Sequence, residues 1–421
     1  MAGVTAERPE VGATPAPGWA ASTFQAFRFR DYRTVWVGSF FAFLAVNMAG
    51  TAQGVVAYDL TGDNGAVGSV MFGQGIAMMV LNPFGGAIAD RFPKRLLILI
   101  SQLVIGSVML SIALLITTGH ISILFLALGS FTMGSMFAVL GPARTALLGE
   151  VVSPGGIGNA MALLQVGGNL ARIVAPLLAS TLLVLLGGSG TYFVIVGIFV
   201  FVLVTMYQIP ASAGRPNRAD TSVLDDVRIG INYTRQHPRL LHGVLSFYCM
   251  TMLAMSSIVL MPGYAKSTLN SGTEGLGIIL ASAAAGGFIL SLAVASQADS
   301  PHIQRLLTLA GLASGVGLIL GGLAPNLPLA VLTMVVVMGG SSVFQTLNNS
   351  QLLRRAEPQF YGRLASLMMI AWGFVNVLSL PVGFLGDAVG ERAALASLGA
   401  ALCVVTLLFA LWERSLSSRG A

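Results

Sequence analysis

The chain has 421 residues, of which 55% are hydrophobic and only 9% are charged. A water-soluble domain usually draws about a quarter of its residues from Asp, Glu, Lys and Arg, so this composition excludes an ordinary soluble protein. The formal net charge of +6 does not by itself indicate nucleic-acid binding, because in such an apolar chain the placement of the charges matters more than their sum.

Apolar runs recur along the chain after an N-terminal tail, residues 1–30, which has no uninterrupted apolar core of the signal-peptide kind. Runs of roughly 20 residues cross a hydrocarbon core about 30 Å thick as helices, which satisfy their own backbone hydrogen bonds in lipid. The ten-residue alternating segments of a membrane barrel are absent from the sequence. We predict twelve membrane-spanning helices, at residues 33–58, 66–89, 95–118, 121–142, 158–186, 190–209, 241–264, 275–296, 305–324, 328–348, 364–388 and 392–412.

The two halves of the chain resemble each other weakly. When the second half is placed over the first, Gly168 aligns with Gly373 and Pro176 aligns with Pro381. Internal symmetry of this kind is typical of transporters. The predicted fold is therefore an all-α membrane protein with twelve helices in two pseudo-symmetric six-helix bundles, residues 31–209 and 241–413, with a linker at 210–240 and a short tail at 414–421.

Within the linker, Val223, Val227, Ile231 and Tyr233 fall roughly on one helical face. This pattern predicts an amphipathic helix along the membrane surface. The linker is either a plain tether between the bundles or a regulatory element.

The basic residues indicate an orientation. Of the 22 lysines and arginines, all but Arg172, Lys266 and Arg392 lie in the tails, the linker and the connections on the same side. By the positive-inside rule both termini and the linker are predicted to be cytoplasmic.

Several motifs carry a family resemblance. The stretch GAIADRFPKR at 86–95 resembles the signature of the major facilitator superfamily between its second and third helices. Further fragments resemble the enterobactin-exporter-like branch of bacterial drug and siderophore exporters: AQGVVAYDLTG at 52–62, GPARTALLGEVV at 141–152, GNAMALLQVGGNLARIVAP at 158–176 and YGRLASL at 361–367. The resemblance implies a multi-pass protein of the bacterial plasma membrane.

The resemblance also implies a conformational gate. In the family the motif joins helices across the cytoplasmic side and stabilises the outward-facing state. Gly86 would permit close helix approach, and Asp90 could pair with Arg91 or accept hydrogen bonds from a helix terminus. A degraded echo, ASQADSPHIQRLLTL, repeats the motif in the second half. The predicted gate residues are Gly86, Asp90, Arg91, Arg95, Arg144, Asp299, Arg305, Gly362 and Arg363.

Arg172 is the clearest ionisable residue deep within a predicted span. Leaving its guanidinium in lipid would cost at least ~3 kcal/mol, so it should face the bundle interior. It either bonds to polar neighbours such as Asn169, or contacts an anionic or polar substrate, or takes part in the conformational switch. The predicted cavity residues are Asn47, Gln53, Gln165, Asn169, Arg172, Gln345, Asn349, Trp372 and Asn376.

Two further features concern hinges and coupling. Pro176 lies in APLLA, which is similar to the exporter-type GPxxG motif of the fifth helix with both glycines replaced by alanine, and Pro381 is its counterpart. Proline frees a backbone carbonyl and favours a bend, so both are hinge candidates. Asp59, near the outer end of helix one, is the candidate for proton coupling. The chain departs here from the family it resembles, in which many members carry an aspartate deeper in helix one, where this chain has Val46 or Asn47.

We therefore expect a secondary active transporter that exports a small amphipathic compound, drug-like or siderophore-like, by alternating access coupled to protons. The chain contains no P-loop and no HExxH pair, so neither an enzyme nor a cofactor or metal is expected, and Cys249 and Cys403 fall within spans. The expected partners are the substrate, protons and the lipid bilayer, not nucleic acid, and a monomer suffices. The alternatives are an uptake carrier on the same fold and a non-transporting receptor or scaffold.

Overall fold

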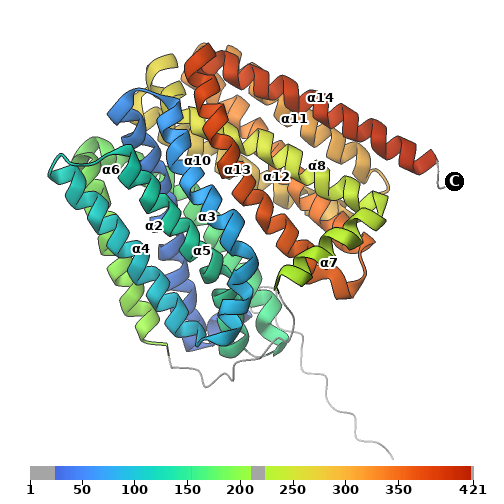
Figure 1. Ribbon diagram of the computed structural model, residues 1–421, viewed down its shortest axis with the longest axis horizontal. Helices are drawn as coiled ribbons and strands as arrows, with labels where there is room; N and C mark the ends of the chain where they lie inside the picture. Colours follow the sequence, from blue (N-terminus) through green and yellow to red (C-terminus); the bar gives the residue numbers. More distant parts are fainter. Residues whose placement is uncertain (1–23, 153, 210–222, 419–421) are drawn as a thin grey trace, which may run out of the picture.

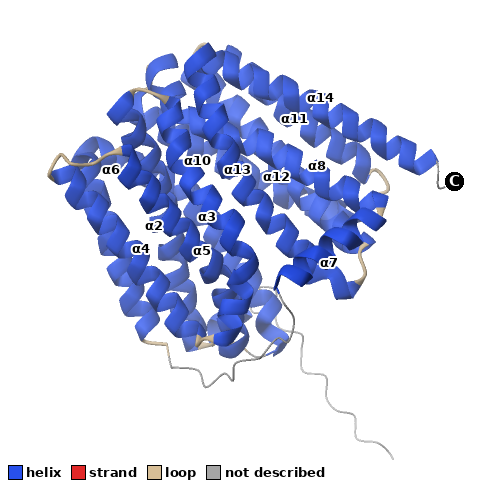
Figure 2. Ribbon diagram, in the orientation of Figure 1, coloured by secondary structure: helices blue, strands red, loops and turns tan. Residues whose placement is uncertain are grey.

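The computed structural model describes residues 24–152, 154–209 and 223–418, and this part of the chain is almost entirely helical (Figures 1 and 2). The first bundle contains α2 (Arg30–Thr61), α3 (Asn64–Arg91), α4 (Lys94–Thr117), α5 (Ile123–Val151) and α6 (Ile157–Tyr207). The linker forms α7 (Val223–Gln236). The second bundle contains α8 (Pro238–Met255), α9 (Met261–Gly263), α10 (Gly272–Ala295), α11 (Ile303–Leu323), α12 (Leu327–Arg355), α13 (Tyr361–Val389) and α14 (Glu391–Ser418).

Helix α6 is a pair of spanning segments joined at one glycine. Gly187 has φ 69° and ψ −176°, a conformation that only glycine adopts readily. Leu163 near the start of α6 accepts a hydrogen bond from Trp36, and Met206 near its end lies against Gly38. Both ends of α6 therefore lie beside the same stretch of α2, and the chain reverses direction at Gly187.

The predicted number of spans is confirmed. Eleven helices among the described residues are long and apolar enough to cross a membrane, and α6 supplies two crossings. Most helices extend a few residues beyond the predicted spans. The span predicted at 241–264 is not one regular helix, because α8 ends at Met255 and short 3₁₀ and π turns flank α9. Pro262, which lacks an N–H donor, lies in this irregular stretch.

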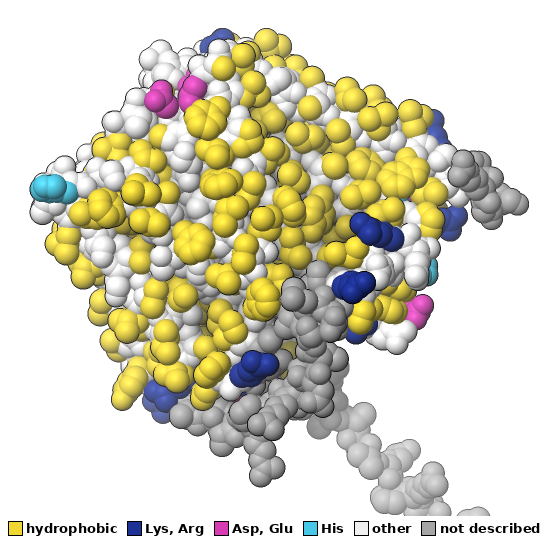
Figure 3. Space-filling view, viewed as in Figure 1, with side chains coloured by type: hydrophobic (Ala, Val, Ile, Leu, Met, Phe, Trp, Pro, Cys, Tyr) yellow, Lys and Arg dark blue, Asp and Glu magenta, His cyan; other side chains and the backbone are white. Residues whose placement is uncertain are grey.

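The surface is apolar where a bilayer would surround it. In the view of Figure 3, hydrophobic side chains cover the middle of the face and most charged side chains lie near its edges. Exposed leucines with more than half of their surface accessible include Leu185, Leu309 and Leu411. In water such a surface would be unfavourable, whereas in lipid it is the expected outer face of a helical bundle.

The two bundles have distinct internal partners and meet along two helix pairs. In the first bundle α2 packs on α6 and α3 on α5, and in the second α10 packs on α12 and α11 on α14. Helix α3 packs on α13, and α6 packs on α10, across the boundary. We call the end of the bundles where α2 stops and α3 begins the distal end, and the opposite end, where α7 lies, the linker end.

The linker helix lies against the second bundle. The Tyr233 ring stacks on Phe360 with ring centroids 3.7 Å apart, and the Tyr233 hydroxyl accepts a hydrogen bond from the Glu357 N–H. Ile231, predicted on the same apolar face as Tyr233, is 37% exposed, whereas Tyr233 and Thr234 are buried. The side chains of Val223 and Val227 lie outside the described residues.

Candidate substrate pathway between the two bundles

Close backbone packing joins α3 to α13 over the distal half of the boundary. A Cβ atom on Gly68 would come within 2.7 Å of the Ser379 carbonyl oxygen, and one on Gly75 within 2.7 Å of the Val377 nitrogen. One on Gly373 would lie 2.9 Å from the Met79 nitrogen. Small residues permit this approach because no side chain separates the two backbones.

Asp387 closes the distal end of this boundary. Its carboxylate accepts hydrogen bonds from the backbone N–H groups of Asn64 at 2.6 Å and Gly65 at 2.8 Å. These are the first residues of α3, whose N–H groups have no partner within the helix. A carboxylate from the second bundle thus caps a helix of the first, and its negative charge also favours the positive end of the helix dipole.

Two more contacts cross the boundary beside Asp387. Glu391 accepts a hydrogen bond from the Asn64 side chain at 3.1 Å and another from Thr268 at 2.9 Å. Lys266 forms an ion pair with Asp59. We call Asp59, Asn64, Lys266, Asp387 and Glu391 the distal latch. No sequence motif marks the distal latch, although acids clustered at the ends of neighbouring spans are a usable signal.

The boundary opens toward the linker end. The Asn82 side chain donates to the Met369 carbonyl at 3.3 Å, and beyond this level Phe84 on α3 and Ser366 on α13 are exposed. Figure 1 shows α3 and α13 side by side at the upper, distal end and apart at the lower end. Helices α3 and α13 therefore pack directly on each other at the distal end and diverge toward the linker end, where α7 contacts both of them.

Arg172 faces the separated part of the boundary. One face of the first half of α6, which includes Gly167, packs on α2, and another, which includes Pro176 and Ser180, packs on α10. At about 100° per residue Arg172 lies between these two faces and away from the exposed Leu170. Arg172 is exposed, and its place between these two faces of α6 directs its side chain toward the boundary between the bundles.

Other predicted cavity residues share this region to different degrees. Asn169 lies one turn and Gln165 two turns from Arg172 on the same side of α6, and Gln165 is exposed. Asn349 on α12 is also exposed, and Trp372 on α13 is half-buried.

Three predicted cavity amides bond mainly within their own helices. Asn47 donates to the Phe43 carbonyl, Asn376 to the Trp372 carbonyl and Gln345 to the Ser341 hydroxyl, each one turn away. Their amide oxygens remain available to a ligand.

Two predictions are corrected by their surroundings. Gln53 is only 4% exposed, because it packs inside the first bundle, accepts a hydrogen bond from Ser130 and donates to the Met133 sulfur. It does not line an open space. Asp59 has a side chain that is 55% exposed and is paired with Lys266 in the distal latch. An exposed, ion-paired carboxylate lacks the dry surroundings that proton coupling requires.

Among the predicted gate residues of the first bundle whose side chains the structure describes, none forms a hydrogen bond or ion pair with the second bundle. Arg91 is exposed, Gly86 has open space beside it, and Arg144 is buried with its guanidinium 4.4 Å from the centroid of Phe43. The side chain of Asp90 lies outside the described residues.

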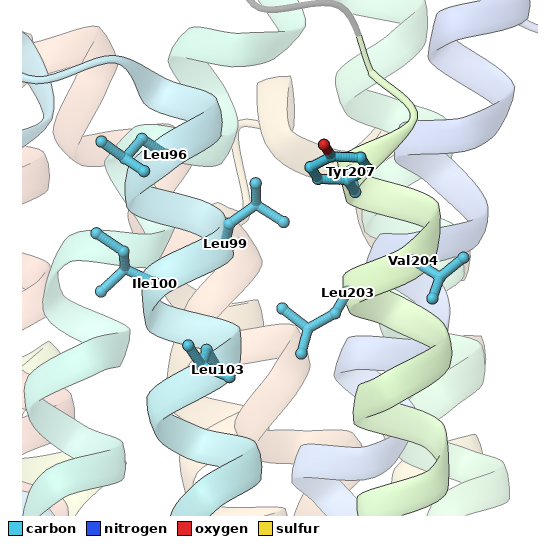
Figure 4. A pocket seen from close by; sticks show the side chains of 7 residues that line it. All are labelled: Leu96, Leu99, Ile100, Leu103, Leu203, Val204 and Tyr207. Atoms are coloured by element: carbon cyan, nitrogen blue, oxygen red, sulfur yellow. The ribbon is translucent and has the colours of Figure 1, made fainter.

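Arg95, near the start of α4, lies against the end of α6. Its guanidinium donates to the Tyr207 carbonyl and lies 5.1 Å from the centroid of that ring. Figure 4 shows the neighbouring groove, with a volume of about 490 Å³, between α4 and the second half of α6. The groove is lined by Leu96, Leu99, Ile100, Leu103, Leu203, Val204 and Tyr207.

In the second bundle, Arg305 and Gly362 are exposed at the linker end, and Arg363 stacks over Phe360 at 5.4 Å beside α7. The side chain of Asp299 lies outside the described residues. The hinge candidate Pro176 lies within the first segment of α6, before Gly187, and Pro381 lies within α13.

One polar cluster was missed from the sequence. His242 is 7% exposed, and its Nε2 lies 2.9 Å from the Phe409 carbonyl. Glu413 is 8% exposed and binds Arg355 and Gln304, each at 3.0 Å. The cluster ties α8, α11, α12 and α14 together within the second bundle, away from the boundary.

Comparisons with known proteins agree with this architecture. The family model of the Major Facilitator Superfamily matches residues 35–379. The chain belongs to the major facilitator superfamily. Among curated relatives, the enterobactin exporter EntS of Shigella boydii serotype 18 is 26% identical over 377 residues, which cover 89% of this chain and 86% of that protein. EntS of Escherichia coli O81 is also 26% identical over the same shares.

Solved structures of this superfamily share the fold at low identity. The nucleoside transporter NupG superposes with a TM-score of 0.75 at 15% identity, over 91% of this chain and 99% of that chain. A bacterial homologue of the human lysosomal transporter Spinster, in an inward-facing and unoccupied conformation, has a TM-score of 0.74 at 12% identity, over 91% and 97% of the two chains. The chain is thus a multi-pass membrane transporter by family and by fold.

Proposed function

We propose that the protein is a secondary active exporter of the bacterial plasma membrane. It moves a small amphipathic compound, siderophore-like or drug-like, out of the cell by alternating access and draws on the proton-motive force. The observation that carries this proposal is the boundary between the bundles, which is held together at the distal latch, while Arg172 on α6 is exposed. The similarity to enterobactin exporters supports export of a siderophore-like compound.

In this proposal the linker end is cytoplasmic, because the basic residues gather there. The conformation described is then open to the cytoplasm, which is where an exporter loads its substrate. Cysteines placed at the distal His120 and at Gln359 of the linker end, both exposed, test the orientation. An impermeant maleimide added to intact cells should label only the former, and the reverse pattern would exclude this orientation.

The cycle needs a second closed state. The distal latch opens, and the linker end closes around Gly86, Asp90 and Arg91 of the first bundle and Gly362 and Arg363 of the second. A Cβ atom on Gly86 would meet no atom of another helix within 4 Å in the present conformation. This position therefore has room to receive a helix from the other bundle. Only one end is open at a time, because the two closures compete.

The experiment is a compound screen that compares a deletion strain with the complemented strain. Compounds that the complemented strain excludes are then tested as substrates in proteoliposomes, with and without an imposed proton gradient. Gradient-dependent exit from the cytoplasmic side supports the proposal. Accumulation in right-side-out vesicles would identify an uptake carrier instead, and absence of any flux would indicate a receptor or scaffold.

A further inference from the structure

Arg172 carries a positive charge near the middle of the membrane. It lies midway between Ile157, where α6 begins, and Gly187, where α6 reverses. Within residues 24–152, 154–209 and 223–418, Arg172 forms no hydrogen bond, ion pair or ring contact with another side chain or carbonyl. Its planar guanidinium therefore keeps its N–H donors free for a ligand.

The described protein offers no counter-charge at this depth. Every Asp and Glu in the described residues lies in a connection or within the first or last two turns of a helix. The carboxylates of the distal latch are already bonded to α3, Thr268 and Lys266. Neighbouring Gln165 and Asn169 are neutral amides.

Alternating access makes this unpaired charge costly. While the linker end is open, water can hydrate the guanidinium. When that end closes, water is displaced, and an isolated cation in a low-dielectric site carries a large desolvation penalty. A ligand that brings its own negative charge removes the penalty, because guanidinium binds an oxyanion through two parallel hydrogen bonds.

We propose that the transported substrate is an amphipathic organic anion whose oxyanion group binds Arg172. This inference rests on the proposed transport function and specifies its substrate class. The apolar body of the anion packs against half-buried Trp372 and exposed Met161, which lies on the same side of α6. Arg172 acts as a binding residue, and the neutral amides around it accept or donate to the remaining polar groups.

An anionic substrate also changes how export is energised. Each anion that leaves the cell carries one negative charge out of a compartment with a negative potential. The membrane potential therefore favours exit by itself, at about 59 mV for each tenfold concentration ratio of a singly charged ion. A mid-membrane carboxylate for proton exchange is then unnecessary, in line with the end positions of the described acids.

The first test measures binding of dansylglycine, a carboxylate, and of its neutral amide to purified full-length protein by dansyl fluorescence. Arg172→Gln removes the charge, Arg172→Lys keeps it without the planar fork, and Arg33→Gln removes an exposed arginine at the start of α2 as a matched control. Thermal unfolding of each variant establishes that it is folded.

We expect dansylglycine to bind the wild type and Arg33→Gln equally, to bind Arg172→Gln about tenfold or more weakly, and to bind Arg172→Lys with intermediate affinity. The neutral amide should bind weakly, and its affinity should be the same for the wild type and for both Arg172 variants. Equal binding of acid and amide, unchanged affinity in Arg172→Gln, or no saturable binding of the acid to the wild type overturns the inference.

A flux experiment separates this inference from the proposed function. Dansylglycine exit from proteoliposomes should rise under an inside-negative potassium diffusion potential, with no pH gradient, and the amide should not respond. If the compounds found in the screen are transported but are neutral or cationic and insensitive to Arg172→Gln, the transport function stands and the anion inference fails. If nothing is transported, the function itself fails.

Discussion

Asp387, near the end of α13, accepts a 2.6 Å hydrogen bond from the backbone N–H of Asn64, the first residue of α3. The contact joins two bundles that are separated by more than three hundred residues of sequence. It combines a helix cap with a charge at the positive end of a helix dipole, and both are available only while the distal ends are together. Asp387 therefore stabilises one conformation of the protein and not the other.

Asp387→Asn should shift the population toward the conformation that is open at the distal end. Loss of the charged cap removes about 1–2 kcal/mol, which corresponds to a factor of roughly 5–30 in the ratio of the two states. Spin labels at His120 and Pro325, exposed at the distal end of the two bundles, report the distance by double electron–electron resonance. Glu274→Gln, which changes an exposed distal acid of α10, is the control. An identical distance distribution in the wild type, Asp387→Asn and Glu274→Gln would contradict the role of the latch.

Gly75→Ala should weaken the distal closure. The added methyl group would lie within 2.8 Å of the Gly373 carbonyl oxygen, and because the neighbour is backbone, the two helices must move apart. Overpacking of this kind costs about 1–3 kcal/mol. Transport and thermal stability should both fall, whereas Gly197→Ala, at an exposed helical glycine with nothing within 4 Å, should leave both unchanged. Equal behaviour of the two variants would argue against close packing at Gly75.

Gly187→Ala should destabilise the folded protein. An L-residue at φ 69° and ψ −176° is strained by about 1–3 kcal/mol. Gly188→Ala is the matched control, because a Cβ there makes only ordinary contacts, the shortest 3.4 Å to Val56. Thermal unfolding in detergent should show a lower midpoint for the first variant alone, and a wild-type midpoint for Gly187→Ala would mean that the chain can reverse in another way.

Glu413→Gln should loosen the linker end of the second bundle. The carboxylate binds Arg355 and Gln304, and hydrogen bonds to charged groups contribute about 1.5–3 kcal/mol each. The neutral amide leaves Arg355, whose side chain is 25% exposed, without its counter-charge. Hydrogen exchange should increase in α12 and α14 and not in the first bundle. Glu357→Gln, at an exposed acid, controls for loss of charge alone, and comparable exchange in both variants would refute the structural role of the cluster.

The fold followed from the sequence more completely than the site did. Hydrophobic runs fix where a chain crosses lipid, so the spans and the two bundles could be predicted from length and composition. The reversal at Gly187 was read as a three-residue connection, because one residue carries no composition signal. Packing contacts such as the hydrogen bond from Ser130 to Gln53 could not be predicted either, because the sequence of a span does not distinguish an amide buried in packing from one that lines a cavity.

Arg172 shows which site residues sequence can reveal. A charge in the centre of an apolar run is costly enough to demand an explanation, so its inward direction could be predicted from energy alone. The capping of α3 by Asp387 could not, because a carboxylate at a helix end is ordinary in sequence and gains its meaning from a partner in the other bundle. The motif residues Gly86, Asp90 and Arg91 remain predictions that concern the opposite conformation.

The reversal at Gly187 has a practical consequence for anyone who handles this protein. Two membrane crossings are connected there by a single residue, so no peptide segment protrudes between them. That point therefore offers neither a cleavage site for proteases nor an epitope for antibodies. An affinity tag inserted there would have to unwind the ends of both crossings. Reporter fusions and fiducial insertions therefore belong in other connections, such as the one between α4 and α5, where Gly119 and His120 are exposed.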